Sequence, residues 1–540
     1  MTNAADWLLY NARIWTGEAE QPWAQALAVR GERIVAVGAD EEIKKLAGLK
    51  TSCVDAGGKL VLPGFIDNHT HFLIGGFQLL SLDLRTVTCK EEFIAAVRQR
   101  AAELPSDAVL GGGGWSNDQW TQTDLPHRSW VDSFTRERPV FLHRSDLHIA
   151  FANSAALRLA GIDKNSPDPV GGQILRDEDT GEPTGILKDN AVKLLQEKLP
   201  APSPEEYDQA LQAAMDCALR SGVTSVQDVT AWRDWLDWEC LLRFQKKQAL
   251  AVRIYARTQI HEWEKQLQLR QDGFADDAWL RLGGLKGFVD GSLGSGTAYM
   301  CEPYDDAPET CGLLTEQMLP EGIMKERLAA ADRAGLAASL HAIGDKANQL
   351  LLDIFEEVEA ENGPRDRRFR IEHAQHLRRE DIGRMARLGV LASVQPGHVA
   401  DDGCWAEKRI GAERCRTTYA FRSLLEAGVP LSFGTDWPVV PLDPFQGIYT
   451  AVTRRTLDGK HPEGWVPEEK LTLEDAVRAY TLGGAYAEFG EQEKGSLKAG
   501  KLADLIMVSQ DVFQVPVDEL PKTKVLLTMV GGQVRYKNKD

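Results

Sequence analysis

The chain has 540 residues, of which 43% are hydrophobic and 26% charged; these are ordinary proportions for a folded enzyme and exclude a disordered chain. Its 62 basic and 80 acidic residues give a net charge of −18, which argues against nucleic acid or an anionic membrane as a partner. We find no membrane-length apolar run and no secretory signal, so we expect a cytoplasmic protein with reduced cysteines that acts on a small molecule.

Short strands are predicted at both ends of the chain. At the N-terminal end they span residues 8–15, 26–30, 33–37 and 59–62. Residues 504–508 and 525–536 are also apolar and rich in β-forming residues, and the pair Gly531-Gly532 suits a hairpin turn. Because these segments flank a long middle, we predict that both ends build one small β domain.

The middle of the chain repeats a unit of amphipathic helix, glycine and short apolar strand. The clearest helix begins after Ser203, which forms a capping box with Glu206, and it ends at Gly222. Eight segments are strand candidates: residues 65–67, 223–229, 251–255, 282–289, 336–340, 368–371, 390–394 and 429–433. Alternation of strands with helices predicts a parallel α/β architecture, and eight strands fit a closed barrel.

One stretch interrupts this alternation. Residues of about 80–202, between the first strand and the Ser203 helix, are rich in glycine, tryptophan and aspartate. They are predicted to form an inserted subdomain. The glycine run at residues 111–114 is not a phosphate-binding loop, because no Gly-Lys-Ser/Thr follows it.

Polar residues stand within or just past the C-terminal ends of the predicted strands. They are His69, His71, Gln227, Asp228, Lys286, Asp290, His341, His373, Gln395 and Asp436. In (β/α)₈ barrels the catalytic groups occupy this face. Structural polar residues have no reason to gather at so many strand ends, so we expect a functional site there.

The histidines and the aspartate predict a metal site. His69 and His71 are two residues apart in an extended segment, so both imidazoles point the same way and can hold one divalent ion, which is most often zinc. Taken alone, His341 and His373 are more often hydrogen-bonded core histidines than ligands, and Asp436 could be a turn or helix-capping residue; taken together they favour metal ligands. A metal lowers the pKa of bound water to about 7, so Asp436 could then act as its base.

Lys286 lies inside an apolar, glycine-rich strand. Burial lowers the pKa of a lysine, and its neutral amine can react with carbon dioxide to form a carbamate. That anionic group could bridge two metal ions. The alternative is a lysine paired with Asp290 or a glutamate.

Five ordered motifs resemble the amidohydrolase superfamily: PGFIDNHTHF from Pro63, LKGFVDGSLGS from Leu285, LHAIGD from Leu340, RIEHAQ from Arg370 and GTDWPV from Gly434. More narrowly, the chain is similar to the branch of N-substituted formamide deformylases and related predicted metal-dependent hydrolases. The likeness extends through the insert and to GKLADLIMV from Gly500, and so spans essentially the whole chain. One departure is Leu147, where relatives more often have glycine before the histidine.

The resemblance implies a distorted (β/α)₈ barrel, residues 63–487, and a β-sandwich from residues 1–62 and 488–540. It further implies two ions, most often zinc, in a binuclear centre. His69, His71 and Asp436 would hold one ion, His341 and His373 the other, and carboxylated Lys286 would bridge them. Membership of the family does not identify the substrate of this chain. We expect a homodimer.

We therefore expect hydrolysis of a non-peptide carbon–nitrogen bond, in an amide or N-substituted formamide, by metal-activated hydroxide. Candidate substrate contacts are Trp115, His148, Asp290 and Gln395. One alternative is a mononuclear deaminase of the same superfamily; the absence of a glutamate in HAIGD disfavours it. The other is an inactive scaffold, which would usually have lost metal ligands.

Overall fold

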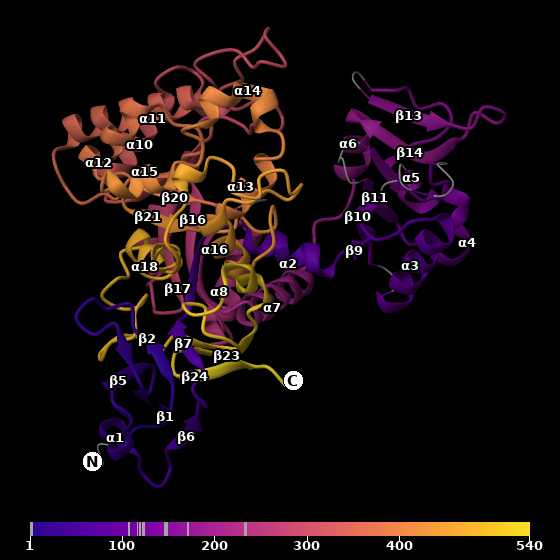
Figure 1. Ribbon diagram of the computed structural model, residues 1–540. Coiled ribbons are helices and arrows are strands. Elements are labelled where there is room, and N and C mark those ends of the chain that lie inside the picture. Colours follow the sequence, from indigo (N-terminus) through magenta and orange to yellow (C-terminus); the bar gives the residue numbers. More distant parts are fainter. Residues whose placement is uncertain are drawn as a thin grey trace. The chain divides into compact units, whose positions relative to one another are not determined.

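Figure 1 shows a computed structural model of the chain. The structure describes residues 4–105, 108–115, 117, 120, 125–144, 149–169, 172–231 and 235–539. The chain divides into two compact units, one of residues 1–72 and 214–540 and the other of residues 73–213. The domain limits predicted at residues 62 and 487 stay a prediction.

The larger unit contains an eight-stranded parallel sheet in which each strand pairs with the next one along the chain. Its strands are β8 (Phe65–Thr70), β15 (Val223–Val229), β16 (Arg253–Gln259), β17 (Leu280–Phe288), β18 (Ala337–Ala342), β19 (Arg370–His373), β20 (Leu391–Val394) and β21 (Leu431–Phe433). The backbone N–H of Asp436 donates to His69 O at 2.8 Å, and a bridge joins Thr70 to Trp437. These contacts connect the first strand to the segment after the last, so the predicted barrel is confirmed.

Helices follow the strands, as expected for parallel strands that need crossover connections. They are α7 (Pro204–Arg220), α8 (Leu236–Lys246), α9 (Trp263–Gln271), α10 (Ile323–Arg333), α11 (Asp345–Asn362), α12 (Arg379–Leu388), α13 (Pro396–Asp402), α14 (Ala406–Cys415), α15 (Phe421–Glu426), α16 (Pro444–Thr453), α17 (Leu473–Ala479) and α18 (Leu482–Ala487). The capping box is present: Ser203 N donates to Glu206 Oε2 at 2.7 Å, and Glu206 N donates to Ser203 Oγ at 3.2 Å. Within the described ranges, no helix is both long and apolar enough to cross a membrane.

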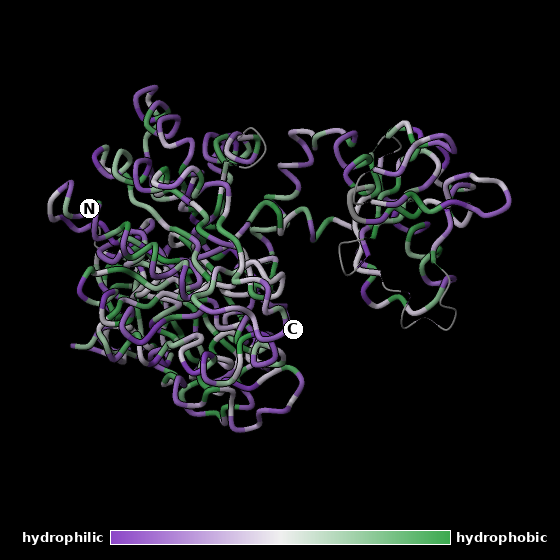
Figure 2. Tube along the Cα trace, turned by 90° about the horizontal axis from the view of Figure 1, so that it is seen from above, coloured by the Kyte–Doolittle hydropathy of each residue, from purple (hydrophilic) through white to green (hydrophobic). Residues whose placement is uncertain are grey.

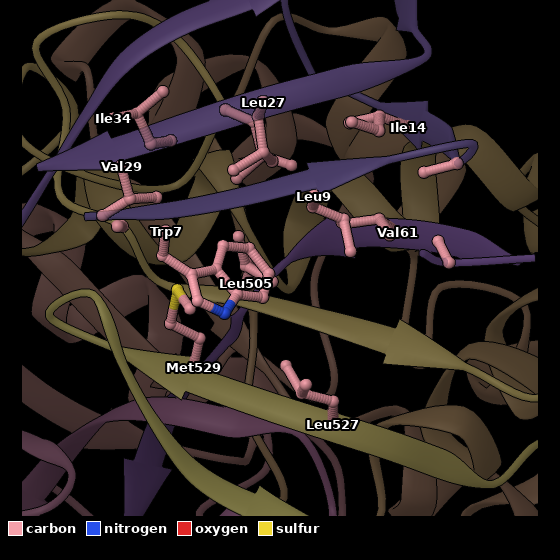
Figure 3. Close-up of a cluster of buried hydrophobic side chains, with 14 residues drawn as sticks. Trp7, Leu9, Ile14, Leu27, Val29, Ile34, Val61, Leu505, Leu527 and Met529 are labelled. Carbon is pink, nitrogen blue, oxygen red and sulfur yellow. The ribbon is translucent and has the colours of Figure 1, made fainter. Parts of the chain in front are cut away.

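Two further sheets of the larger unit form the β-sandwich. The first has β1 (Trp7–Tyr10), β4 (Ala26–Arg30), β5 (Arg33–Gly38) and β6 (Ser52–Asp55), with α1 (Asp40–Ile43) after β5. The second has β2 (Arg13–Trp15), β3 (Trp23–Ala24), β7 (Leu60–Pro63), β22 (Leu505–Val508), β23 (Val525–Val530) and β24 (Gln533–Lys537). In Figure 3, Leu9 and Leu27 of the first sheet face a common core with Leu505 of the second. Both chain ends therefore build this domain, as predicted.

The smaller unit has its own six-stranded sheet, inserted after the first barrel strand as predicted. It contains β9 (Leu82–Asp83), β10 (Leu110–Trp115), β11 (Val140–Arg144), β12 (Ile149–Ala152), β13 (Gly172–Arg176) and β14 (Pro183–Asp189), with helices α2 (Phe72–Leu80), α3 (Lys90–Glu103), α4 (Asp132–Thr135), α5 (Ser154–Ala160) and α6 (Asn190–Gln196). Phe93, Trp115 and Phe151 are fully buried in one of its apolar clusters. In Figure 2 hydrophilic and hydrophobic stretches alternate along the chain of each unit, as expected of elements with one buried face.

Candidate metal centre

The carboxyl ends of the barrel strands bring together the residues predicted as ligands. His69 lies in β8, Lys286 in β17, His341 in β18 and His373 at the end of β19, while His71 and Asp436 follow β8 and β21. His69 Nε2 is 3.4 Å from Lys286 Nζ, and the ring of His373 is centred 5.1 Å from that of His69 and 4.5 Å from that of His341. Residues far apart in the chain thus form one buried cluster.

Three of these residues have the spacing of a metal site. Asp436 Oδ1 lies 3.4 Å from His69 Nε2 and 3.3 Å from His71 Nε2. Ligands about 2.1 Å from a tetrahedral zinc ion are about 3.4 Å from one another. Asp436 Oδ1 is buried and, among the described residues, accepts no well-formed hydrogen bond. An orphaned carboxylate oxygen facing two imidazole nitrogens fits a divalent cation.

Hydrogen bonds orient three of the imidazoles. His69 Nδ1 bonds to Glu372, His373 Nδ1 lies 2.8 Å from Gln395 Oε1, and His341 Nε2 lies 3.0 Å from the carbonyl oxygen of Gly291. Each bond occupies one ring nitrogen and leaves the other for an ion. Metal-binding histidines in proteins are usually held in this way.

Burial sets the protonation of the cluster. It lowers the pKa of His69 to about 3 and that of His341 to about 4, so both imidazoles are neutral and able to bind a metal. It also lowers the pKa of Lys286 to about 7. Burial raises the pKa of Asp436, but electrostatic interactions and hydrogen bonding with the facing imidazoles, His69 first, outweigh it and hold that pKa well below its usual value.

Glu372 is a functional candidate that the sequence reasoning missed. Its Oε2 accepts hydrogen bonds from His69 and from Ser393 Oγ, the latter at 2.5 Å. Its Oε1 accepts from Arg257 and from Arg370 Nε. The side chain is fully buried, and the two guanidinium groups outweigh the effect of burial and hold its pKa well below the usual range. A glutamate within the buried strand Arg370–His373 was the available signal.

The predicted substrate contacts have different surroundings. Asp290 accepts backbone hydrogen bonds from Tyr299, Ile343 and Gly344 at 2.8–3.0 Å, and so fastens two loops. Gln395 holds His373, as described above. In the smaller unit, Trp115 is fully buried and donates from Nε1 to Leu142 O at 3.0 Å, which is a packing role. His148, with Leu147, lies outside the described residues.

Two further histidines lie near the cluster. His376 is buried and bonded, with Nδ1 2.8 Å from Thr418 Oγ1 and Nε2 3.1 Å from Gln375 Nε2. His398, in the first turn of α13, has Nε2 3.8 Å from Asp436 Oδ2. Its nitrogen, one of His373 and an oxygen of Asp436 lie within 4.8 Å of one another, so the structure adds His398 to the cluster.

Known proteins resemble this chain along nearly its whole length. A family model described as the amidohydrolase family matches residues 52–536. Protein LONG AFTER FAR-RED 3 of Arabidopsis thaliana is 40% identical, over 98% of this chain and 92% of its own, and an N-substituted formamide deformylase of Arthrobacter pascens is 30% identical over 99% of both. The crystal structure of an uncharacterized metal-dependent hydrolase from Pyrococcus furiosus superposes with a TM-score of 0.79 and 30% identity, covering 94% of this chain and 99% of that one.

Proposed function

This chain belongs to the amidohydrolase family of metal-dependent hydrolases, and from that premise we propose that it hydrolyses amides, N-substituted formamides foremost, with two divalent metal ions. It is an enzyme that acts on carbon–nitrogen bonds other than peptide bonds. The formamide preference rests on the named activity of the Arthrobacter relative. We place the reaction in the cytoplasm.

The convergence of His69 and His71 on the orphaned oxygen of Asp436 is the observation that supports this proposal most directly. In the proposed centre these three residues would hold one ion, and His341 and His373 would hold the second. Zinc is the ion that best suits this mixture of imidazole and carboxylate ligands. When bound, the ions polarise the substrate carbonyl and lower the pKa of water.

Lys286 is proposed to bridge the two ions as a carbamate. Its pKa of about 7 means that much of the amine is neutral at physiological pH, and a neutral amine can attack carbon dioxide. A nitrogen–carbon bond forms, one proton leaves, and the product has a negative charge. Lys286 Nζ lies 3.4 Å from His69 Nε2, so the negative charge of the carbamate would lie within the cluster.

Asp436 is the proposed base and acid of the reaction. As water adds to the carbonyl carbon, the carboxylate accepts one of the water protons. It then gives the proton to the amide nitrogen as the carbon–nitrogen bond breaks, which releases an amine and a carboxylic acid. The unusually low pKa of Asp436 keeps it ionised before each turnover and favours the second transfer.

The test combines metal analysis with a substrate panel. We expect about two zinc equivalents per chain and release of formate from N-butylformamide, with the His71→Ala variant, which loses a ligand of one ion, as the inactive control. The panel also includes N-acyl amino acids, cyclic amides, lactones and esters. One equivalent of metal with ammonia release from amino-substituted rings would instead identify a mononuclear deaminase. A protein with neither metal nor hydrolysis would contradict the proposal.

A further inference from the structure

His398 occupies a fixed position beside the proposed metal centre. It is in the first turn of α13, which begins directly after β20 with Gln395 as its N-cap and Pro396 at its first position. His398 N donates to Gln395 O at 3.2 Å. Because Gln395 also holds His373, one short segment positions both imidazoles.

The imidazole of His398 faces the reacting groups. Its ring is nearly parallel to that of His373, with centroids 6.1 Å apart and planes 13° apart. Its Nε2 lies 3.8 Å from Asp436 Oδ2, the carboxylate oxygen that does not face His69 and His71. The side chain is 14% exposed, whereas that of His69 is 1% exposed, so His398 borders the open side of the cluster.

A purely structural role does not fit His398. Nε2 is buried and has no hydrogen-bond partner among the described residues. His376, the nearby structural histidine, has a hydrogen-bond partner for each ring nitrogen, Thr418 and Gln375. A buried polar atom without a partner lowers the stability of the folded protein, so its presence here indicates a partner from outside the chain.

The position of His398 fits a metal ligand less well than a residue that lies next to the metal centre without binding an ion. The distances from His69 and His71 to Asp436 match the edge of a zinc tetrahedron, but the distance of 3.8 Å from His398 is longer. Catalytic zinc sites also keep one position open for water or substrate. A further histidine ligand would fill that position.

We propose that His398 contacts the substrate and donates a hydrogen bond from Nε2 to the carbonyl oxygen as this oxygen becomes negatively charged. This inference rests on the proposed amide hydrolysis. The oxygen gains its charge when water adds to the carbonyl carbon beside Asp436. A preorganised donor at that point stabilises the charge more strongly in the transition state than in the substrate, and removing one such donor typically lowers kcat about 10²–10³-fold.

The test compares glutamine and asparagine at this position. The amide nitrogen of glutamine can occupy roughly the place of imidazole Nε2, whereas that of asparagine ends one bond earlier. We expect His398→Asn to lower kcat for N-butylformamide about 10²–10³-fold and His398→Gln to restore part of that loss. KM should change little, because the bond strengthens only in the transition state. His376→Gln is the matched control and should leave kcat near that of the wild type.

A binding measurement provides a readout independent of turnover. Methylphosphonate is a tetrahedral anion that mimics the charged oxygen, while acetate is planar; both are titrated calorimetrically into zinc-loaded protein. We expect His398→Asn to weaken methylphosphonate binding at least tenfold more than acetate binding, with zinc content unchanged. An unchanged ratio, or loss of a zinc equivalent, would overturn the inference. If the wild type hydrolyses no amide, the proposed function is wrong. The ratio of methylphosphonate to acetate binding still tests the role of His398 in that case.

Discussion

Two buried carboxylates of the barrel, Glu372 and Asp436, have opposite surroundings. Both oxygens of Glu372 accept hydrogen bonds, and two arginines balance its charge. Asp436 faces three imidazoles but its Oδ1 has no well-formed hydrogen bond among the described residues. A saturated carboxylate holds other groups in place, while an unsaturated one is available to a cation or a substrate. The comparison predicts that replacing Glu372 harms stability, whereas replacing Asp436 harms chemistry.

Asp436→Asn should have the largest effect on activity. Asparagine keeps the shape but removes the base and the anionic ligand, so we expect amide hydrolysis to fall about 10⁴-fold, the upper end for a lost general base. The melting temperature of the metal-free protein should change little, because Oδ1 has no well-formed hydrogen bond to lose among the described residues. Steady-state kinetics and thermal denaturation check this. A large loss of stability with activity retained would reverse the comparison.

Lys286→Ala should come next, because it removes the proposed bridge and leaves a cavity beside His69. We expect a large loss of hydrolysis, smaller than that of Asp436→Asn, and a zinc content lower by about one equivalent. Acetate or propionate added to the variant should restore part of the activity by filling the cavity with a carboxylate. Full activity without any added acid would refute the carbamate.

Glu372→Gln should act mainly on stability. It leaves Arg257 and Arg370 buried without their common counter-charge, which costs about 3–5 kcal/mol. The loss of the His69 contact should also weaken zinc binding about 10–100-fold. Urea denaturation and chelator competition measure the two effects. Ser393→Ala is the control: it removes one hydrogen bond to Glu372 and should cost about 1 kcal/mol.

Trp115→Phe should have the smallest effect. It removes the hydrogen bond to Leu142 O and keeps most of the aromatic packing in the smaller unit, so we expect a loss of about 1 kcal/mol in stability. The kcat/KM for N-butylformamide should stay within about twofold of the wild type. A fall in kcat/KM beyond tenfold would instead support the predicted substrate contact of Trp115, in spite of its burial.

Much of the fold could be predicted because local patterns encode it. All eight predicted barrel strands are present, and their ends shift by only a few residues; β15 (Val223–Val229) agrees in full. The capping box at Ser203 is likewise a local signal. The family resemblance is confirmed by the match over residues 52–536. For the six predicted ligands, the structure brings the side chains together, and their role stays a prediction.

The network around Glu372 could not be predicted, because three of its partners, His69, Arg257 and Ser393, come from other strands. His69 and Glu372 are 303 residues apart in the chain, and only the register of the closed sheet places them in contact. Gln395 and His398 stand three residues apart, yet one orients a neighbouring histidine and the other lies beside Asp436.

The sequence by itself determined which residue types stand at the ends of the strands, because the alternation of helices and apolar strands is a local property. It also determined the family, through motifs of a few residues each. Only the tertiary structure decided which of those side chains are saturated with hydrogen bonds and which are left open. An unpaired polar group raises the free energy of the folded protein when it is buried away from water. Hydrogen-bonded side chains therefore support the site, while the unpaired ones are available to bind a metal ion or a substrate.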